Sequence, residues 1–255
     1  MDTLNLKGGA NMQRYIHIII FTCLITLSTS CAVTPPYNPF IKSRSEILNT
    51  VDVVSMTPVE LMDFDRKDEV AARYEALITE RLEAAGFKVI PSGAFSSIWD
   101  PMIEQLGGLF DPITGQADEE KLKAVQSRIT NELITKFDID GYVRPRVEVT
   151  TANWNSNKAT WDGVTDETTG KEGFWADFFG PQATGSIPAL SLILPLTDTS
   201  GETYYVGRGG IQLIAHVELG TFTDVPESMW FVEPERDVNA VSIALAPLLN
   251  EPVAQ

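Results

Sequence analysis

Thiol and imidazole side chains, which carry much nucleophilic and metal chemistry, are scarce in this 255-residue chain. Two cysteines, Cys23 and Cys31, and two histidines, His17 and His216, make up the whole set. Three of these four residues lie at or before position 31, so the rest of the chain holds one imidazole and no thiol. A metal site built from several histidines or cysteines is therefore excluded there, as is a disulfide. A serine–histidine–aspartate site would have to use His216, whose apolar neighbours are typical of a strand residue.

Carboxylates gather at three places, and two of these have simple structural explanations. Asp63, Asp65 and Asp68 precede an apolar helical pattern, where helix capping accounts for them more simply than a bound cation. Asp138 and Asp140 lie at a helix–strand junction and lack the spacing of a calcium loop, which favours a solvated turn. No metal is therefore expected at either group.

The third acidic group, Asp162, Asp166 and Glu167, follows Trp161 directly. An aromatic ring beside paired acids is an arrangement expected of a glycan site. Glycosidases need two carboxylates at a set separation, and spacing along a loop does not establish that separation. Glycan binding or hydrolysis is therefore kept as an alternative function.

Aromatic residues are concentrated between positions 153 and 187, among Gly, Thr, Asn and acidic residues. Protein interfaces use such side chains as buried anchors because each carries a large apolar area. This composition fits two interpretations. The rings fold back as a lid over the sheet or flank a long hairpin, or they form a partly exposed loop that binds a partner protein, glycan or lipid. The candidate partner-binding residues are Trp154, Trp161, Phe174, Trp175, Phe178 and Phe179.

Cys31 stands at the end of a segment with the features of a secretory signal. Arg14 precedes an apolar run over 16–27, and the small residues Ser28, Thr29 and Ser30 lead into the cysteine. The run is too short to span a bilayer comfortably. Small residues ending in a cysteine resemble the lipobox of bacterial lipoproteins, which implies cleavage before Cys31 and a lipid on it. Ser28 departs from that pattern, which usually has leucine there. Plain secretion and an amino-terminal anchor helix remain alternatives.

The charge balance limits how the chain could bind its partners. It has 35 acidic and 19 basic residues, a formal net charge of −16 at pH 7. This charge opposes general electrostatic binding to nucleic acid or to anionic lipid headgroups. Membrane attachment would therefore come from lipid at Cys31. A single acyl chain binds a membrane weakly, whereas several acyl chains bind it firmly.

The chain divides into three expected parts. Residues 1–30 form a lipoprotein-type signal peptide, with Met12 an alternative start to Met1. Residues 31–46, which include three prolines, form an extended tether. Residues 47–250 form a single α/β domain, with the aromatic-rich insertion at 153–187. A composition of 44% hydrophobic and 21% charged residues is ordinary for such a domain.

The first half of the domain predicts a β-α-β unit. Val51–Met56 reads as a strand, and a helix follows with Asp65 or Asp68 as its N-cap and Gly86 as its stop. Phe87–Pro91 then returns as a short strand. The crossover between such parallel strands is right-handed.

The sequence of the second half predicts, in order, a helix, an edge or bulged strand, a long hairpin and a final helix. Helices come early and the hairpin comes late, which predicts an α/β fold with a mixed sheet and helices packed on it. The expected segments are a helix from Asp118 to Phe137, a strand over Tyr142–Val149 interrupted by Pro145, a hairpin turning at Asp198–Gly201 with a bulge at Gly209–Gly210, and a helix over Asp237–Leu249.

Three stretches carry a resemblance to a known group: Leu82–Ile90, Phe137–Val143 and Leu192–Thr203. Their order between Val51 and Val217 resembles the α/β domain of envelope lipoproteins related to the curli secretion channel. It is also similar to the amino-terminal domain of the Tol system's β-propeller protein. The resemblance implies the fold, an envelope location and a role in assembly, and it brings no catalytic residues. The chain has no convincing pair of membrane-spanning strands, which argues against a pore.

These features predict a non-enzymatic, lipid-anchored protein of the bacterial cell envelope. It would act as an assembly or accessory factor through other envelope proteins or self-association, without a cofactor. Ala32 after Cys31 favours the outer membrane, facing the periplasm, because the usual retention signal there in enteric bacteria is aspartate. The alternative is a periplasmic glycan-binding or hydrolytic module that uses the aromatic and acidic loop.

Overall fold

The computed structural model describes residues 37–110, 114–155, 157–168, 184–218 and 221–251. The chain divides into two units, Met1–Asn38 and Pro39–Gln255, and every helix and strand considered below belongs to the second. Across the described residues, no helix is both long enough and apolar enough to cross a membrane.

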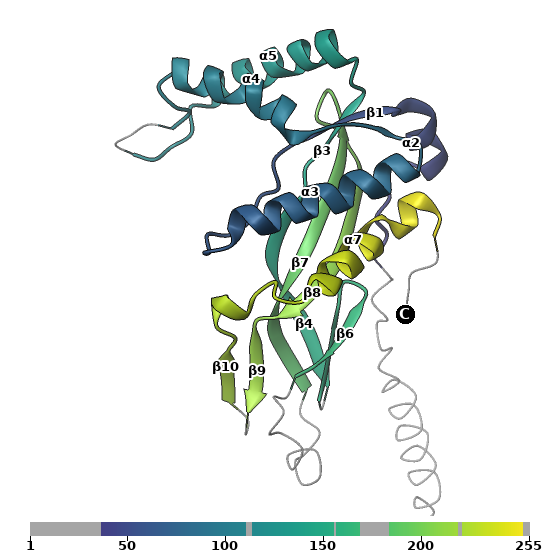
Figure 1. Ribbon diagram of the computed structural model, residues 1–255, viewed down its shortest axis with the longest axis vertical. Coiled ribbons are helices and arrows are strands. Elements are labelled where there is room, and N and C mark those ends of the chain that lie inside the picture. The colour runs from purple at the N-terminus through teal and green to yellow at the C-terminus, as the bar shows by residue number, and fades with distance from the viewer. Residues whose placement is uncertain (1–36, 111–113, 156, 169–183, 219–220, 252–255) are drawn as a thin grey trace, which may run out of the picture. The chain divides into compact units, whose positions relative to one another are not determined.

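The second unit is a mixed α/β structure with helices packed against a curled sheet, as the sequence predicts (Figure 1). Its elements, in chain order, are α2 (Arg44–Thr50), β1 (Val53–Met56), α3 (Lys67–Ala84), β2 (Lys88–Ile90), α4 (Ser92–Gln105), α5 (Glu119–Phe137), β3 (Gly141–Val143), β4 (Arg146–Asn155), β5 (Lys158–Trp161), β6 (Val164–Glu167), β7 (Thr184–Asp198), β8 (Thr203–Leu213), β9 (Ala215–Glu218), β10 (Thr221–Asp224), the 3-10 helix η2 (Glu227–Met229) and α7 (Pro234–Leu249).

The expected β-α-β unit is present, with β1 pairing in parallel with both β2 and β3. Helix α3 connects β1 to β2 and buries one stripe at helical spacing, and Gly86 ends it with a φ of +97°. The predicted N-cap is wrong, because Arg66 holds that position without a side-chain cap. Asp68 instead lies in the first turn, where a negative charge interacts favourably with the helix dipole.

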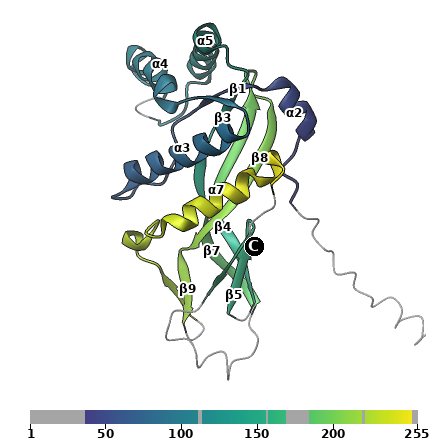
Figure 2. The same cartoon turned by 45° about the vertical axis from the view of Figure 1, so that its right-hand side comes forward.

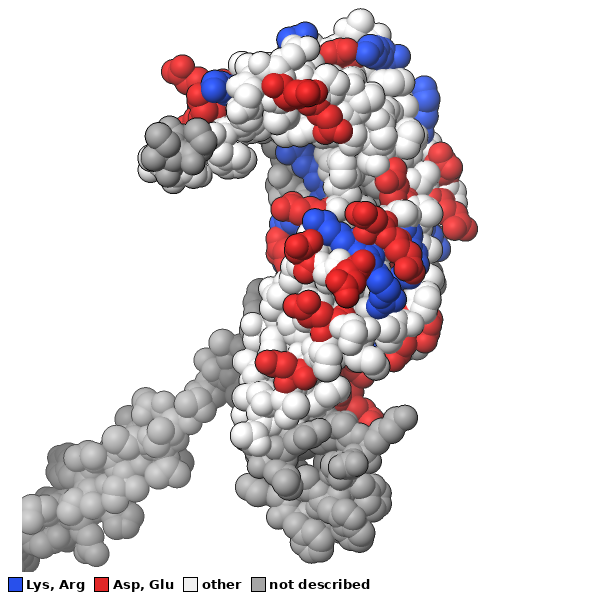
Figure 3. Space-filling model, turned by 60° about the vertical axis from the view of Figure 1, so that its left-hand side comes forward, with Lys and Arg blue, Asp and Glu red and all other residues white. Residues whose placement is uncertain are grey.

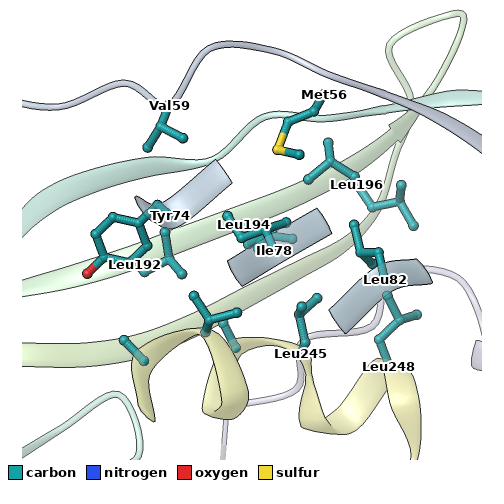
Figure 4. Close-up of a cluster of buried hydrophobic side chains, with 14 of the residues drawn as sticks. Met56, Val59, Tyr74, Ile78, Leu82, Leu192, Leu194, Leu196, Leu245 and Leu248 are labelled. Carbon is teal, nitrogen blue, oxygen red and sulfur yellow. The ribbon is translucent and has the colours of Figure 1, made fainter. Parts of the chain in front are cut away.

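The sheet has two buried faces. Successive side chains of a strand point to opposite faces, and here they enter different clusters. Val54 and Val143 belong to the large cluster covered by α3 and α7, which lie side by side across the long strands (Figure 2). Figure 4 shows leucines of β7 meeting Tyr74 and Ile78 of α3 in that cluster. Tyr142, next to Val143, enters the second cluster under α4 and α5.

The long hairpin of β7 and β8 is the centre of the sheet. Strands β3 and β4 both pair antiparallel with β7, and Pro145 lies in the gap between them. The predicted edge position or bulge is wrong, because β3 also pairs with β1, β4 also pairs with β5, and the register with β7 continues unchanged across the gap. On the other side, β8 pairs with β7 through a register shift at Leu190/Ser191, opposite Gly210 and Gln212. This irregularity confirms the predicted bulge.

The far end of the sheet curls until its two sides meet. Strands β5 and β6 extend the sheet beyond β4 and fold back toward β8. The amide of Gly210 in β8 donates a hydrogen bond of 2.9 Å to the carbonyl oxygen of Asp162, in the β5–β6 turn. A small apolar cluster that includes Trp161 fills the interior of this curl.

Helix α7 approaches β8 closely because glycines face it. A Cβ built on Gly207 would lie 2.1 Å from the carbonyl oxygen of Ala244, and one on Gly209 would lie 2.0 Å from that of Ala240. The helix begins at Pro234, three residues before its predicted start, and proline suits a first helical position. The glycines therefore permit contact between a helix backbone and a strand.

Two helices were not predicted, and the tether was predicted too long. Helices α2 and α4 are present where no helix was expected. Within the expected tether, Phe40 forms an isolated bridge with Tyr205, and the amides of Ile41 and Lys42 bond the carbonyl oxygen of Tyr204 at 3.0 and 3.1 Å. The chain therefore joins the domain at residue 39, where it lies along the outer edge of β8.

The predicted hairpin turn is held by the carboxylate of Asp198. Its Oδ1 accepts hydrogen bonds from Ser200 Oγ at 2.8 Å and from the amide of Glu202 at 2.7 Å. Partial burial pushes the pKa of Asp198 upward, but these hydrogen bonds outweigh burial and lower that pKa below its ordinary value of 3.8.

This lowered pKa predicts how the turn responds to acid. The stabilising effect of the Asp198 carboxylate is fully present above pH 3.8 and is lost as pH falls through the lowered pKa. Urea unfolding at a series of pH values should show wild type losing more stability than Asp198→Asn between about pH 5 and about pH 2. Equal losses in the two proteins would contradict this assignment.

Candidate functional site

The two candidate partner-binding tryptophans that the structure describes are packed against the domain. Trp161 is 6% exposed, and its Nε1 donates a hydrogen bond of 3.2 Å to the carbonyl oxygen of Leu190. Trp154 packs partly buried against the same cluster. These contacts favour the packing alternative for both rings. The other four candidates, Phe174, Trp175, Phe178 and Phe179, lie outside the described residues.

Two members of the acidic group near Trp161, Asp162 and Asp166, form ion pairs within the fold. Asp162 accepts a hydrogen bond from Ser191 Oγ at 2.6 Å, and it pairs with Arg208, whose Nε lies 3.0 Å from Oδ1. Asp166 pairs instead with Arg236 of α7. Asp162 therefore fixes the β5–β6 turn on β7 and β8, which explains why a residue with a φ of +33° is held there.

The carboxylates at the two ends of α5 and at the start of β3 serve the fold in a similar way. Asp140 Oδ2 accepts hydrogen bonds from the amides of Asp52 and Val53, each at 2.9 Å, and so joins β3 to the start of β1. Asp138 is the left-handed C-cap of α5, and Asp118 caps the other end through the amide of Lys121. Asp138 and Asp140 therefore have structural roles, although these roles are a helix cap and a link between strands and not only the solvated turn that was predicted.

His216 lies on β9 beside an open pocket of about 160 Å³. Its Nδ1 is buried and has no hydrogen-bond partner in the structure. Arg236, on the same pocket, is neutralised by Asp166 and Glu233. Among the described residues that line this pocket there is no serine or threonine, so the geometry does not provide the nucleophile that a His216 base would activate.

A buried carboxylate joins α3 to α7. Asp237 is fully buried, accepts a hydrogen bond of 2.7 Å from the Tyr74 hydroxyl, and lies 2.6 Å from Arg73 Nη2. The same guanidinium donates to the carbonyl oxygen of Phe231. Burial raises the pKa of Asp237, while the Tyr74 hydrogen bond and the Arg73 charge oppose that rise. The group holds α3 and α7 together.

A different crevice lies where the parallel strands end, and we call it the carboxyl-end crevice. Thr57 follows β1 directly, Arg144 follows β3 directly, and Phe95 lies near the start of α4, after β2. Strand β1 lies between β2 and β3, and the connections from β1 and from β2 run over opposite faces of the sheet. Open α/β sheets bind ligands outside the carboxyl ends of their strands, at the place where the connections from adjacent strands leave over opposite faces.

Aromatic rings line this crevice. The rings of Phe95 and Trp99, on successive turns of α4, stack with centroids 5.6 Å apart. Tyr142 of β3 lies on the same cavity, whose volume is about 140 Å³, and its hydroxyl donates a hydrogen bond of 2.9 Å to Thr130 Oγ1. Burial raises the pKa of Tyr142, although the Thr130 hydrogen bond and the Arg144 charge oppose that rise, so the hydroxyl is neutral at pH 7.

Arg144 is the one charged residue among those that line the crevice. Its guanidinium carbon lies 5.1 Å from the centroid of the Tyr142 ring, a cation–π distance. Five other arginines of the described chain form ion pairs with carboxylates, whereas none joins Arg144 there. Figure 3 shows the surface hollowed below α4 and α5, with basic side chains on the wall of the hollow.

Sequence reasoning missed this crevice because its residues are far apart in the chain. Helix α4, which supplies Phe95 and Trp99, was not predicted at all. The signal that could have found it is the position of Thr57 and Arg144, each next to the carboxyl end of a parallel strand. Within the described ranges, no group of three or more His, Cys, Asp or Glu residues is placed to hold a metal.

Comparison with known proteins adds no relative to this description. No protein-family model, no curated protein and no solved structure matches the chain.

Proposed function

We propose that this protein is a lipid-anchored component of the bacterial cell envelope. It acts as a non-enzymatic assembly or accessory factor, through contacts with other envelope proteins or with copies of itself. The observation that carries this proposal is the sequence before Cys31, in which Arg14, a short apolar run and three small residues precede the cysteine. Ala32 directs the anchored protein to the outer membrane, facing the periplasm.

The arrangement of side chains in the domain supports a role in protein contacts. The carboxylates Asp162, Asp166 and Asp237 are engaged within the fold, because each forms an ion pair that joins two elements. Some apolar side chains remain exposed instead: Met229 and Val232, beside the His216 pocket, are 54% and 41% exposed. Methionine adapts readily to varied partners, and exposed apolar side chains around a hollow are common at protein interfaces.

The anchor and the contacts can be tested together in cells. Mild crosslinking followed by purification from solubilised membranes is expected to give specific partner or ladder bands for wild type. Cys31→Ala should lose these bands and the covalent lipid, and should keep its apolar amino-terminal segment, because cleavage and lipidation both need that thiol. Cys23→Ala, which removes the other cysteine of the chain, is the matched control and should behave as wild type.

Two results would overturn the proposal. A lone monomer in both wild type and Cys31→Ala would show that the anchored protein makes no stable contacts. A wild-type protein that is found at the membrane without covalent lipid would replace the lipid with an anchor helix at the amino terminus.

A further inference from the structure

We propose that the carboxyl-end crevice binds a single aromatic ring that carries a carboxylate group. This inference concerns a ligand site on the domain and does not depend on the anchor at Cys31. It rests on the size of the cavity, on the rings that line it, and on the guanidinium at its edge.

The size and walls of the crevice suit one aromatic ring. A cavity of about 150 Å³ is large enough for benzene in another protein, and this one has a volume of about 140 Å³. Phe95 and Trp99 are both half-buried, and their stacked rings form one wall, with Tyr142 contributing from the sheet. A bound ring would stack on, or meet edge to face, rings already held in place by helix and strand.

The charge at the crevice suits a carboxylate. An arginine presents a planar fork of donors that pairs with a carboxylate in two parallel hydrogen bonds. Arg144 has no carboxylate partner within the described chain, and its contact with the Tyr142 ring places the guanidinium beside the aromatic wall. The protein as a whole carries a net charge of −16, so an anion gains attraction only where a cation such as Arg144 is left unneutralised.

Two sources of ligand share this chemistry. One is a small free aromatic acid, and the other is the carboxyl-terminal aromatic residue of a polypeptide. Phenylacetate represents the first and a tripeptide ending in phenylalanine represents the second. Equal affinity for the two probes would favour the free acid, whereas tighter binding of the tripeptide would favour a protein terminus.

The site is tested by titrating the purified full chain with N-acetylphenylalanine and with its neutral amide, and following binding by calorimetry. Wild type is expected to bind the carboxylate at least about tenfold more tightly than the amide, because only the carboxylate pairs with Arg144. Arg144→Gln should lose that difference, and Trp99→Ala should weaken binding of both probes. Arg128→Gln, an exposed arginine of α5 outside the crevice, is the matched control and should bind as wild type does.

The substitution at Arg144 should leave the fold intact. The side chain is exposed, and the backbone amide that bonds the carbonyl oxygen of Pro195 at 3.1 Å remains in Arg144→Gln. An unchanged Tm would show this. The proposal fails if wild type binds neither N-acetylphenylalanine nor its amide, if it binds these two compounds equally, or if Arg144→Gln retains the preference for the carboxylate.

Discussion

Replacing Gly209 with alanine is expected to lower the free energy of unfolding by about 3 kcal/mol. The added methyl group would lie 2.0 Å from the carbonyl oxygen of Ala240 and 2.7 Å from its carbonyl carbon. These are backbone atoms of α7, so no side chain can rotate to relieve the clash. Helix α7 must move away from β8, which opens the large apolar cluster that α3 and α7 cover. Urea unfolding followed by circular dichroism measures the loss.

Gly93→Ala is the matched control for this substitution. Gly93 lies in α4 with a negative φ, and a Cβ built there meets nothing within 4 Å. Alanine also has the higher helix propensity, so this variant should be unchanged or more stable by about 0.5 kcal/mol. Equal stability of Gly209→Ala and Gly93→Ala would contradict the close contact between α7 and β8.

Replacing Asp237 with alanine should also destabilise the domain strongly, by about 3 kcal/mol. The variant leaves the Tyr74 hydroxyl buried without its acceptor and leaves Arg73, whose side chain is 20% exposed, without its counter-charge. Removal of one member of a buried pair costs far more than the pair itself contributes, because the charge that remains is not solvated. Thermal unfolding at pH 7 measures the effect as a fall in Tm.

Glu69→Ala tests the same arginine from its exposed side. Glu69 lies 3.5 Å from Arg73 Nη1, but its side chain is 63% exposed. An exposed pair of this kind contributes about 0.5 kcal/mol or less. Asp237→Asn adds a second comparison, because the amide oxygen can still accept the Tyr74 hydrogen bond while the charge is lost. A similar small effect from Asp237→Ala and Glu69→Ala would mean that Asp237 is not a structural clamp.

The parts of the fold that sequence predicted correctly depend on local signals. Asp198 and Gly201 specify their own turn by side-chain hydrogen bonding and a φ of +92° at the glycine. Asp118 caps α5 through an amide only three residues away. Such contacts span a few residues, so the residue types and their spacing suffice to predict them.

Helix α4 was missed because its local signals are weak or contrary. Gly93 and Pro101 both lie inside it, and Pro91 rather than a capping side chain precedes it. Ile98 and Met102 are its two buried apolar residues, too short a stripe for a periodic pattern. Its packing on α5 and on the sheet stabilises it, and that contact is not encoded in any one segment.

The environment of Trp161 also depends on contacts distant in sequence. An exposed and a buried tryptophan beside acidic residues look the same in the chain. The ring is buried here because β5 and β6 curl onto β8, where a Cβ on Gly210 would lie 2.9 Å from Trp161 Nε1. A small residue such as Gly210 facing a large one such as Trp161 would indicate this packing, but the two can be matched in the sequence only when the strand pairing is known.

The way the chain enters the domain determines where a mechanical load would act. A pull on the amino-terminal part reaches the fold first at Pro39, whose carbonyl oxygen accepts a hydrogen bond of 2.8 Å from the Val206 amide. Phe40 then meets the Tyr205 ring edge to face, with centroids 5.2 Å apart, and the Tyr205 hydroxyl bonds the carbonyl oxygen of Ala244 in α7. Force would therefore pass from the entering segment through Tyr205 to α7. The contacts of Pro39 and Phe40 with β8 should be the first in the domain to break under tension.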